Sequence, residues 1–387
     1  MEKFDALILG GGASGMIAAI KLAERKKKVA IIEKGFSVGK KLLVTGNGRC
    51  NLTNMNLSSH FYNQDISKFL KRFDEKETLK FFKDLGLLST IDEEKRVYPF
   101  SNSAKSVLEV LINRLKELKV EFFEGEEILE ILKDKSFKIK TSKREYLVPK
   151  VVVATGGKTD LKLFEKFKIK TKEFAPSLVA LKTNSTKRLN GVKVSNVLVS
   201  ATCGKKINRE LGEVLFKESG LSGIVIFNMS ALFARENNYS GEIEIDLMPN
   251  FKEDEVLYLL NSRKNLSGNI LEGIFVRELY LELFDRLGID NKPAKKMTTK
   301  ELEKLAKMIK HLKFKVCGYY DNSQVSSGGI LLSELTENLE SKKNSGLYFT
   351  GEIIDVDGIC GGYNLEWAWT SGAIVGESLW LKFRISK

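Results

Sequence analysis

The sequence predicts an α/β protein in which a parallel sheet is interrupted by a second, antiparallel β domain. Three strands that each end in a glycine turn indicate the parallel sheet, at residues 4–9, 150–154 and 347–350. The run at 150–154 is continuously apolar, as is typical of a central strand buried on both faces. Short alternating runs between residues 178 and 247 instead indicate an antiparallel barrel or sandwich.

The first of these turns carries the most specific motif. Residues 4–9 run into Gly10-Gly11-Gly12-Ala13-Ser14-Gly15, and an apolar-periodic helix follows to residue 23. Gly10 allows the tight turn, Gly12 allows the backbone to approach a pyrophosphate, and Gly15 allows helix and strand to pack closely. A second strand at 28–32 ends at Glu33, which is positioned to bind a ribose. The pattern predicts a Rossmann-like domain that binds a dinucleotide, against the alternative of a purely structural turn.

Composition indicates a globular chain of two or three domains. The 387 residues are 43% hydrophobic, and no run of 18 apolar residues occurs. The N-terminus enters the first strand without the features of a signal peptide, so we expect a cytoplasmic protein with no membrane partner. Four widely spaced cysteines and two histidines argue against both a metal site and a disulfide framework.

The net charge of +13 is unevenly distributed. Residues 158–210 hold thirteen Lys and Arg against four Asp and Glu, and residues 291–315 hold nine Lys against two Glu. Charge runs are usually solvated faces, but two clusters in the middle of the chain favour a polyanionic partner.

Residues 38–54 show no amphipathic period, and their glycines, amides and hydroxyls predict an ordered loop. Lys41 and Arg49 could offset phosphate charge, and Asn47, Asn51 and Asn54 could donate and accept hydrogen bonds at a ring edge. Long ordered loops are more often functional than decorative, although an Asn-rich surface loop is the alternative.

The remaining elements complete a discontinuous domain with an insert. We expect helices at 65–85 and 103–118, a turn at 220–223, and three helices between residues 250 and 311, the last opening with the capping box Thr298 to Glu301. Expected strands lie at 120–123, 128–131, 137–140, 146–148, 178–181, 192–194, 197–199, 224–226 and 243–245. The predicted division is a dinucleotide-binding domain at 1–177 and 322–387, a β-barrel-like substrate domain at 178–249 and 312–321, and a helical subdomain at 250–311.

The chain resembles the BaiN/RdsA family of flavoproteins, which are YhiN-like oxidoreductases of the two-dinucleotide-binding-domain type. The matching motifs span nearly the whole chain: residues 10–15, 46–54, 97–99, 154–157, 212–216, 220–223, and 351–364 with Gly361-Gly362-Tyr363-Asn364. The resemblance implies FAD, a barrel-like domain and a helical subdomain. After residue 157 the chain departs from the family pattern, because a basic stretch replaces a Ser/Gly-rich segment, and Val325–Ile330 varies mildly from it.

From the turns and the resemblance together we expect a set of FAD contacts. They are Gly10, Gly12, Ala13, Ser14, Gly15, Glu33, Lys34, Lys41, Gly48, Arg49, Asn51, Ile128, Ala154, Thr155, Gly156, Gly351, Glu352, Gly358, Gly362, Tyr363 and Asn364. No second Gly-x-Gly-x-x-Gly turn is present, so NAD(P)H is expected only as a transient reductant, unless another electron donor replaces it.

The resemblance implies reduction of a carbon–carbon double bond conjugated to a carbonyl. Hydride passes from reduced flavin to the electron-poor carbon, and a general acid protonates its neighbour. Members act on unsaturated 3-oxo bile acids in one branch and on a uridine of large-subunit (23S) ribosomal RNA in another, where the product is dihydrouridine. The charge favours the RNA dihydrouridine synthase branch. The alternatives are a small-molecule enone reductase or amine oxidase without an RNA substrate, and an RNA-binding flavoprotein without activity.

Two sets of residues follow from this reading. Cys50 and Cys360 are the candidate proton donors, because an ordinary thiol is protonated at pH 7, although Cys50 is equally typical of a buried packing residue. The candidate contacts to ribosomal RNA are Lys162, Lys166, Lys187, Arg188, Lys205, Lys206, Lys300, Lys304 and Lys307.

Overall fold

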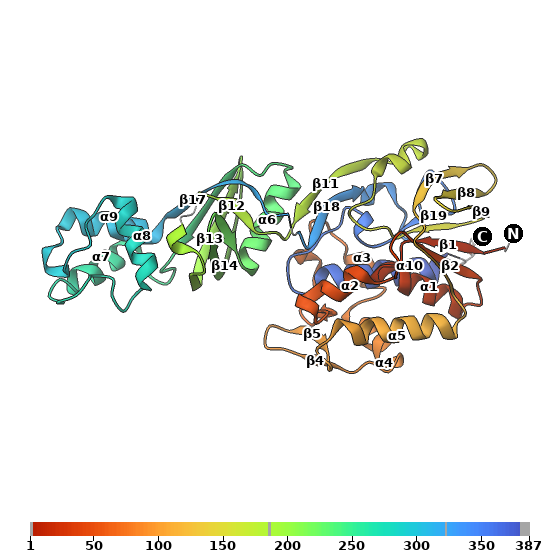
Figure 1. The fold of residues 1–387 in the computed structure, drawn as a ribbon, viewed down its shortest axis with the longest axis horizontal. Coiled ribbons are helices and arrows are strands. Elements are labelled where there is room, and N and C mark those ends of the chain that lie inside the picture. Colours follow the sequence, from red (N-terminus) through yellow and green to blue (C-terminus); the bar gives the residue numbers. More distant parts are fainter. Residues whose placement is uncertain (1–2, 185–186, 322, 380–387) are drawn as a thin grey trace. The chain divides into compact units, whose positions relative to one another are not determined.

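The computed structural model describes residues 3–184, 187–321 and 323–379, and the chain divides into two compact units. Unit 1 comprises Met1–Ala175 and Val325–Lys387, and unit 2 comprises Pro176–Gln324. The chain therefore leaves unit 1 once, builds unit 2 and returns (Figure 1). The finer division into three domains stays a prediction.

Unit 1 is built on a five-stranded parallel sheet of order β19–β10–β1–β2–β6. Its strands are β1 (Ala6–Leu9), β2 (Val29–Glu33), β6 (Glu121–Glu124), β10 (Val151–Val153) and β19 (Leu347–Phe349). β1, β10 and β19 are buried at every residue, as their apolar runs predicted. The predicted Rossmann-like α/β fold is confirmed.

Two buried helices, α1 (Ala13–Glu24) and α10 (Tyr363–Ser378), pack against each other from opposite ends of the chain. Gly372 allows the close approach, because a Cβ there would lie 2.3 Å from Ile17 Cγ2 and 2.5 Å from the Ser14 carbonyl oxygen. Overpacking of this kind costs about 1–3 kcal/mol or more. Segment 325–379 is therefore part of the core of unit 1 rather than an appendage.

Smaller elements surround this sheet. The helices are α2 (Lys40–Val44), α3 (Ser67–Leu70), α4 (Glu75–Asp84) and α5 (Ala104–Glu117). One three-stranded sheet contains β3 (Thr53–Asn54), β5 (Arg96–Pro99) and β4 (Ser89–Ile91), and another contains β7 (Ile128–Lys133), β8 (Phe137–Thr141) and β9 (Glu145–Val148). β11 (Thr171–Ser177) pairs with β18 (Val325–Ile330).

Unit 2 contains a closed six-stranded barrel, which confirms the predicted barrel-like fold. In barrel order its strands are β12 (Leu181–Thr183), β15 (Gly220–Ser222), β14 (Lys206–Lys217), β13 (Lys193–Cys203), β16 (Gly241–Asp246) and β17 (Leu312–Tyr319). β17 follows the helices and closes the barrel by pairing with both β16 and β12.

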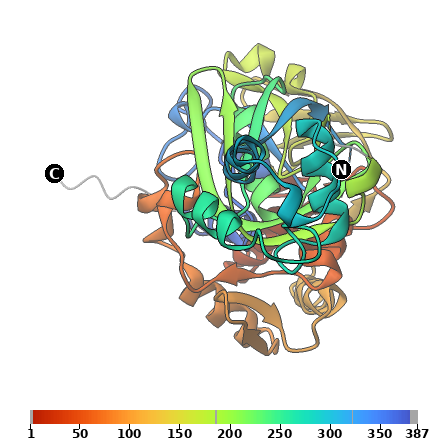
Figure 2. The same cartoon turned by 90° about the vertical axis from the view of Figure 1, so that its left-hand side faces the viewer.

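Four helices accompany the barrel: α6 (Ile224–Arg235), α7 (Glu253–Ser262), α8 (Arg277–Leu287) and α9 (Thr299–Lys310). Figure 2 views unit 2 from the side of α7, α8 and α9. The predicted capping box of α9 is present, with Thr298 and Glu301 each bonded to the other's backbone N–H. The barrel and these helices share one hydrophobic core.

The expected strand at 224–226 is wrong, because these residues form the first turn of α6. A short apolar run does not distinguish a strand from a buried helix, and here the apolar character continues to Ala234. Gly223, with φ of +108°, reverses the chain between β15 and α6. The turn expected at 220–223 is therefore only partly right. Residues 220–222 form the strand β15, and the chain turns at Gly223.

Four other expectations need correction. The strand expected at 178–181 is wrong except at its last residue, because β11 ends at Ser177, β12 begins at Leu181, and Leu178 has a φ of +51°. The helix expected at 65–85 is two helices, because Asp74 caps α4 by accepting hydrogen bonds from the N–H groups of Lys76 and Glu77. The loop expected at 38–54 contains α2, which is too short for its period to be recognised. The strands expected at 192–194 and 197–199 are one strand, β13, with a register shift at Asn196, whose φ is +57°.

Candidate functional site

The first glycine turn has the geometry that a dinucleotide requires. A Cβ on Gly10 would lie 2.4 Å from the Ala154 carbonyl oxygen, and one on Gly15 would lie 2.1 Å from the Gly10 carbonyl oxygen. At Gly12, by contrast, nothing lies within 4 Å of the Cβ position. The backbone at Gly12 therefore faces open space at the N-terminus of α1, where N–H groups and the helix dipole favour a phosphate.

Glu33 lies beside this turn at the end of β2. Its Oε2 accepts a hydrogen bond of 2.8 Å from the Gly11 N–H, and its Oε1 accepts one of 2.8 Å from the Gly35 N–H. The Glu33 carbonyl accepts from Glu126 N–H, two residues before Ile128. Lys34 is exposed and forms an ion pair of 2.6 Å with Glu127. The carboxylate of Glu33 is thus held in place next to the first glycine turn.

Glu352 joins the second and third turns. Its Oε1 accepts from the Ser326 N–H at 2.9 Å, and its Oε2 accepts from the Gly157 N–H at 3.2 Å and from the Lys41 ammonium. Gly351 is pressed against α1, because a Cβ there would lie 2.4 Å from Ser14 Oγ. The three turns therefore meet at the carboxyl ends of β1, β10 and β19, as ligand sites in such sheets do.

The turn at residues 358–364 is fixed by Asn364 and by the loop at 46–54. The Asn364 side chain accepts from the Gly358 N–H at 2.9 Å and donates to the Gly358 carbonyl at 2.8 Å. Asn54 Nδ2 donates to the Gly361 carbonyl at 3.0 Å. A Cβ on Gly362 would lie 2.6 Å from the Thr53 carbonyl oxygen. These contacts bring the loop and the N-terminus of α10 together.

Asn51 supplies a direct test of whether this site suits a cofactor. Its side chain is buried, and its Oδ1 has no hydrogen-bond partner among the described residues. The same atom lies 2.9 Å from the position of a Cβ on Gly362. Buried acceptors are normally satisfied, so the site offers an unused acceptor to a ligand N–H. Together with the open space at Gly12, this fits a nucleotide that carries a heterocyclic ring.

Arg49 projects from the same loop and is exposed. Its guanidinium carbon lies 4.4 Å from the centroid of the Tyr98 ring, and its Nη2 donates to the Tyr98 hydroxyl at 3.3 Å. Gly48 precedes it with φ of +80°, a conformation that favours glycine. The Tyr98 ring thus positions Arg49.

The segment Phe61 to Gln64 is a part of the site that sequence patterns did not reveal. The Tyr62 hydroxyl donates to the Tyr363 carbonyl at 2.8 Å, and the Asn63 side chain accepts from the Asp357 N–H at 3.0 Å. These residues lie between motifs and follow no period, so no signal in the sequence distinguished them.

The two candidate thiols have different surroundings. Cys50 is 0% exposed with φ of +60°, and burial raises the pKa of its thiol to about 12. Cys360 is half-buried in the turn that precedes α10. Burial of Cys50 supports its alternative reading as a packing residue, because the thiolate left after proton donation would be poorly solvated.

Glu366, one turn into α10, is a second group that the sequence did not reveal. Its carboxyl group is fully buried, and its Oε1 accepts from Thr78 Oγ1 at 3.0 Å and from Thr370 Oγ1 at 3.1 Å. Burial raises its pKa to about 7, and the neighbouring threonine hydroxyls limit the rise. Thr78 comes from α4, so only the tertiary structure shows that this glutamate is buried.

The nine candidate RNA contacts are divided between the units, with Lys162 and Lys166 in unit 1 and the other seven in unit 2. Four are held in ion pairs: Lys166 with Glu130, Lys187 with Glu218, Lys206 with Glu236 and Arg188 with Asp285. The other five, Lys162, Lys205, Lys300, Lys304 and Lys307, are exposed. Within unit 2, the turn at Lys205 lies beside the start of β16, whereas α9 lies beyond its end.

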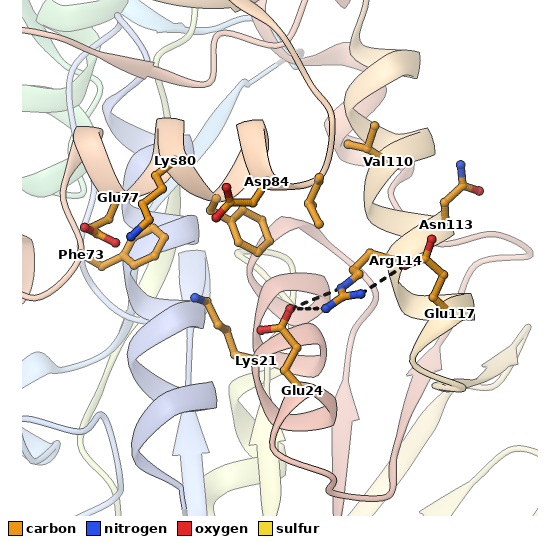
Figure 3. Close-up of a pocket in the computed structure, with 12 residues that line it drawn as sticks. Lys21, Glu24, Phe73, Glu77, Lys80, Asp84, Val110, Asn113, Arg114 and Glu117 are labelled. Carbon is orange, nitrogen blue, oxygen red and sulfur yellow. Dashed lines mark hydrogen bonds and ion pairs between the residues drawn. The ribbon is translucent and has the colours of Figure 1, made fainter.

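A separate cavity of about 490 Å³ lies between α1, α4 and α5 (Figure 3). Lys21 and Glu24 line it from the C-terminal end of α1, about 15 Å from Gly12 at 1.5 Å per residue. Arg114 pairs there with Glu24 at 2.9 Å and Glu117 at 3.2 Å. This cavity is therefore distinct from the dinucleotide site.

Over residues 3–184, 187–321 and 323–379, no group of three or more His, Cys, Asp or Glu is arranged to hold a metal ion. Within the same ranges, no helix is both long and apolar enough to cross a membrane.

Comparison with known proteins gives matches over nearly the whole chain. Residues 4–378 match a family model described as the HI0933-like protein Rossmann domain. A 3-dehydro-bile acid delta(4,6)-reductase of Clostridium scindens is 33% identical over 401 residues, covering 96% of this chain and 98% of that protein. A ribosomal RNA dihydrouridine synthase of Escherichia coli is 27% identical over 409 residues, covering 98% of each chain.

A solved structure supports the fold. A 3-ketosteroid-delta4-(5alpha)-dehydrogenase from Rhodococcus jostii matches with a TM-score of 0.51 and 13% identity, covering 97% of this chain and 96% of that chain. At this identity the likeness concerns the fold alone.

The geometry at Gly12 gives a first prediction. We expect Gly12→Val to fold, because its φ of −79° suits any residue and its Cβ position is open, but to bind FAD about tenfold more weakly or worse by blocking the pyrophosphate. Flavin absorbance of the purified protein and a thermal unfolding curve of the apoprotein measure both effects. Gly10→Val is the comparison, since its clash with Ala154 should destabilise the apoprotein as well. Full FAD content in Gly12→Val would contradict the assignment.

The buried carboxyl of Glu366 gives a second prediction. Its pKa is about 7 in the folded chain and about 4.3 unfolded, so the folded state holds a proton that the unfolded state loses between these values. The stability that this group contributes is fully present below pH 4.3 and is lost as pH rises through 7, by about 4 kcal/mol in total. Urea unfolding of the apoprotein measures the free energy of unfolding at pH 5 and pH 8. This free energy should fall less between the two pH values in Glu366→Gln than in the wild type. Exposed Glu109→Gln is the control, and parallel pH dependence of all three proteins would refute the prediction.

Proposed function

Because the chain belongs to the HI0933-like family of Rossmann-domain, flavin-dependent oxidoreductases, we propose that it reduces a carbon–carbon double bond conjugated to a carbonyl. We propose further that the natural substrate is a uridine of large-subunit (23S) ribosomal RNA, which becomes dihydrouridine. Family membership itself confirms three expectations from the sequence: the BaiN/RdsA resemblance, the Rossmann-like fold with its barrel, and the status of an FAD-dependent enzyme.

The residues of the three converging turns suit FAD. Gly12 and the N-terminus of α1 would hold the pyrophosphate, and Glu33 would hold a ribose hydroxyl. Asn51, with its unused buried acceptor, and the N-terminus of α10 would hold the ring. Bound FAD supplies hydride to an electron-poor carbon. The remaining expected contacts from the sequence, including Lys34, Ile128 and Thr155, stay predictions.

Glu352 and Lys41 have a positioning role in this proposal. Their ion pair, together with the Glu352 bonds to Gly157 and Ser326, holds the second turn against β18. Lys41 is thereby neutralised by a carboxylate rather than left for a phosphate. Arg49, stacked on Tyr98 and exposed, is the cation better placed for a phosphate of cofactor or substrate.

The observation that carries the RNA proposal is charge. The chain has a net charge of +13, and a polyanion binds such a surface through Lys and Arg contacts to its phosphates. A uridine must be unstacked before its ring meets a buried flavin, at a cost of a few kcal/mol that phosphate contacts offset. Lys162, Lys205, Lys300, Lys304 and Lys307 suit this role best, because they are exposed and outside the ion pairs that engage the other four candidates.

A second candidate is an enone reductase that acts on a small apolar molecule. It is favoured by the 33% identity to the bile acid reductase, which exceeds the 27% identity to the Escherichia coli RNA enzyme. Both reactions add hydrogen to an alkene conjugated to a carbonyl, so the same flavin site serves either. NAD(P)H is proposed as the transient reductant in both cases. The amine oxidase alternative finds no supporting observation in the described residues.

For the proton donor we favour Cys360 over Cys50. Cys360 is half-buried in the turn at residues 358–362, next to the expected ring contacts, whereas Cys50 packs in the core. A half-buried thiol donates a proton more readily than one whose pKa burial raises to about 12.

The substrate proposal predicts that ribosomal RNA from cells lacking this gene loses one dihydrouridine. Chemical mapping of dihydrouridine in large-subunit RNA, with and without the gene, measures it directly. Restoring the gene should restore the modification, and restoring the Gly12→Val form should not. An unchanged map, together with salt-independent turnover of a small cyclic enone, would instead establish the second candidate.

The proton-donor proposal predicts different effects for the two thiols. Cys360→Ala should slow reoxidation of the reduced flavin by an enone about a hundredfold, the scale of general acid catalysis, while leaving flavin reduction by NAD(P)H unchanged. Cys50→Ala should lower the stability of the protein and leave both half-reactions near the wild-type rates. Stopped-flow absorbance of each half-reaction separates these outcomes. Normal reoxidation in Cys360→Ala would place the acid elsewhere.

A further inference from the structure

A basic and aromatic cluster that includes none of the candidate lysines suggested by the sequence lies on the outside of the barrel. It consists of Lys182 on β12, Lys217 on β14 and Tyr320, which directly follows β17. The Lys182 ammonium lies 5.6 Å from the centroid of the Tyr320 ring, and the Lys217 ammonium lies 4.6 Å from it. Both ammonium groups therefore lie over the same aromatic ring.

Strand pairing explains how the two lysines reach the same ring. Lys182 pairs with Gly220 of β15, and Gly220 pairs with Lys217, so the three residues form one row across adjacent strands. Gly220 in the middle has no side chain, and a Cβ there would lie 2.8 Å from Tyr320 Cε2 and 2.3 Å from the Leu181 carbonyl oxygen. The glycine thus leaves a space on the barrel surface that the tyrosine ring occupies.

The main chain holds the ring in this place. The Tyr320 N–H donates to the Ala180 carbonyl at 2.9 Å, which fixes the residue as the chain leaves β17. Gly318 pairs with Lys182 on the other side, so that lysine has glycines as both cross-strand neighbours. Its side chain is exposed, whereas Lys217 and Tyr320 are half-buried. Such a ring needs little further ordering when it binds a ligand.

The charges around this row remain available to a ligand. In the part of the chain that the structure describes, Lys182 and Lys217 are in none of the ion pairs with carboxylates, unlike Lys193 and Lys313 on neighbouring strands. Two acids adjoin the cluster in sequence: Glu218 is bound by Lys187 at 3.1 Å, and Asp321, which follows Tyr320, is exposed. Two ammonium groups beside an aromatic ring are complementary to a nucleotide, whose phosphates meet the cations and whose base stacks on the ring.

We propose that Lys182, Tyr320 and Lys217 form a stacking platform for single-stranded RNA on the barrel of unit 2. The inference rests on the proposed function, because it assigns part of the RNA substrate to a surface outside the flavin site. Base stacking on an aromatic side chain tolerates any base, so the platform supplies affinity and orientation rather than sequence recognition. The uridine that reacts is a different nucleotide from the one that stacks.

The test is binding of the holoenzyme to a fluorescein-labelled, uridine-rich single-stranded RNA of about 12 nucleotides, followed by anisotropy at several salt concentrations. Tyr320→Ala should weaken binding about tenfold, and Tyr320→Phe should retain it, because the ring is kept. Lys182→Ala/Lys217→Ala should weaken binding and make the slope of log K against log salt shallower by about 1.4, the value for two phosphates.

The matched control is Lys193→Ala/Lys313→Ala, which removes two barrel lysines that carboxylates already neutralise and should leave the salt slope unchanged. FAD content and thermal unfolding verify that each variant is folded. If the wild type binds RNA and the platform variants bind equally well, the platform is refuted and the proposed function stands. If only the lysine variant weakens binding, the surface attracts charge without stacking, and the platform is again refuted. If the wild type binds no RNA, the platform is refuted too, and the dihydrouridine map decides the function separately.

Discussion

The structure of unit 1 depends on the absence of side chains where three chain segments meet. Gly10 contacts the Ala154 carbonyl, Gly15 contacts Gly10, and Gly351 contacts Ser14, each at a distance that excludes a Cβ. These contacts set the positions of β1, β10 and β19 and of the two helices that begin beside them. At Gly12 nothing lies within 4 Å of the Cβ position, and this open face is where a ligand can approach the backbone. Gly10 and Gly15 are therefore required because protein atoms lie too close for a side chain, whereas Gly12 is required because a side chain would fill the space left for a ligand.

Local patterns predicted the parts of the fold that depend on local physics. The buried strand at 151–153, the capping box at Thr298 and the glycine turns all follow from short-range periodicity or backbone freedom. The run at 224–226 failed because a buried helix and a buried strand share one composition, and only length and burial separate them. The break at Asp74 was missed although its capping residue was present, because apolar residues continue on both sides.

In the candidate site, too, residues that belong to a local motif were predicted, and residues whose partners are distant in the chain were missed. Glu33 and Gly12 were predicted because a motif assigns their roles by spacing. The structure shows Glu33 bonded to the Gly11 N–H and an open Cβ position at Gly12, and their contacts to a cofactor stay predictions. Glu366 and Tyr62 were missed because their importance comes from partners far away in the chain, such as Thr78 and Tyr363. The count of charge could not reveal that carboxylates engage some of the candidate lysines, for example Lys166 with Glu130 and Lys206 with Glu236. Lys182 and Lys217 became visible only through strand register.

The discontinuity of unit 1 has a consequence for how the protein matures during synthesis. Domains generally fold as units while the chain emerges from the ribosome at about 5–20 residues per second. Unit 2 is continuous and is complete before β19 and α10 have been made. Four of the five strands of the parallel sheet must therefore wait, with one edge of β10 unpaired and one side of α1 uncovered, until the last segment arrives. Cofactor loading is thus a late event, and a ribosome that stalls after unit 2 leaves a folded barrel attached to an incomplete, aggregation-prone sheet.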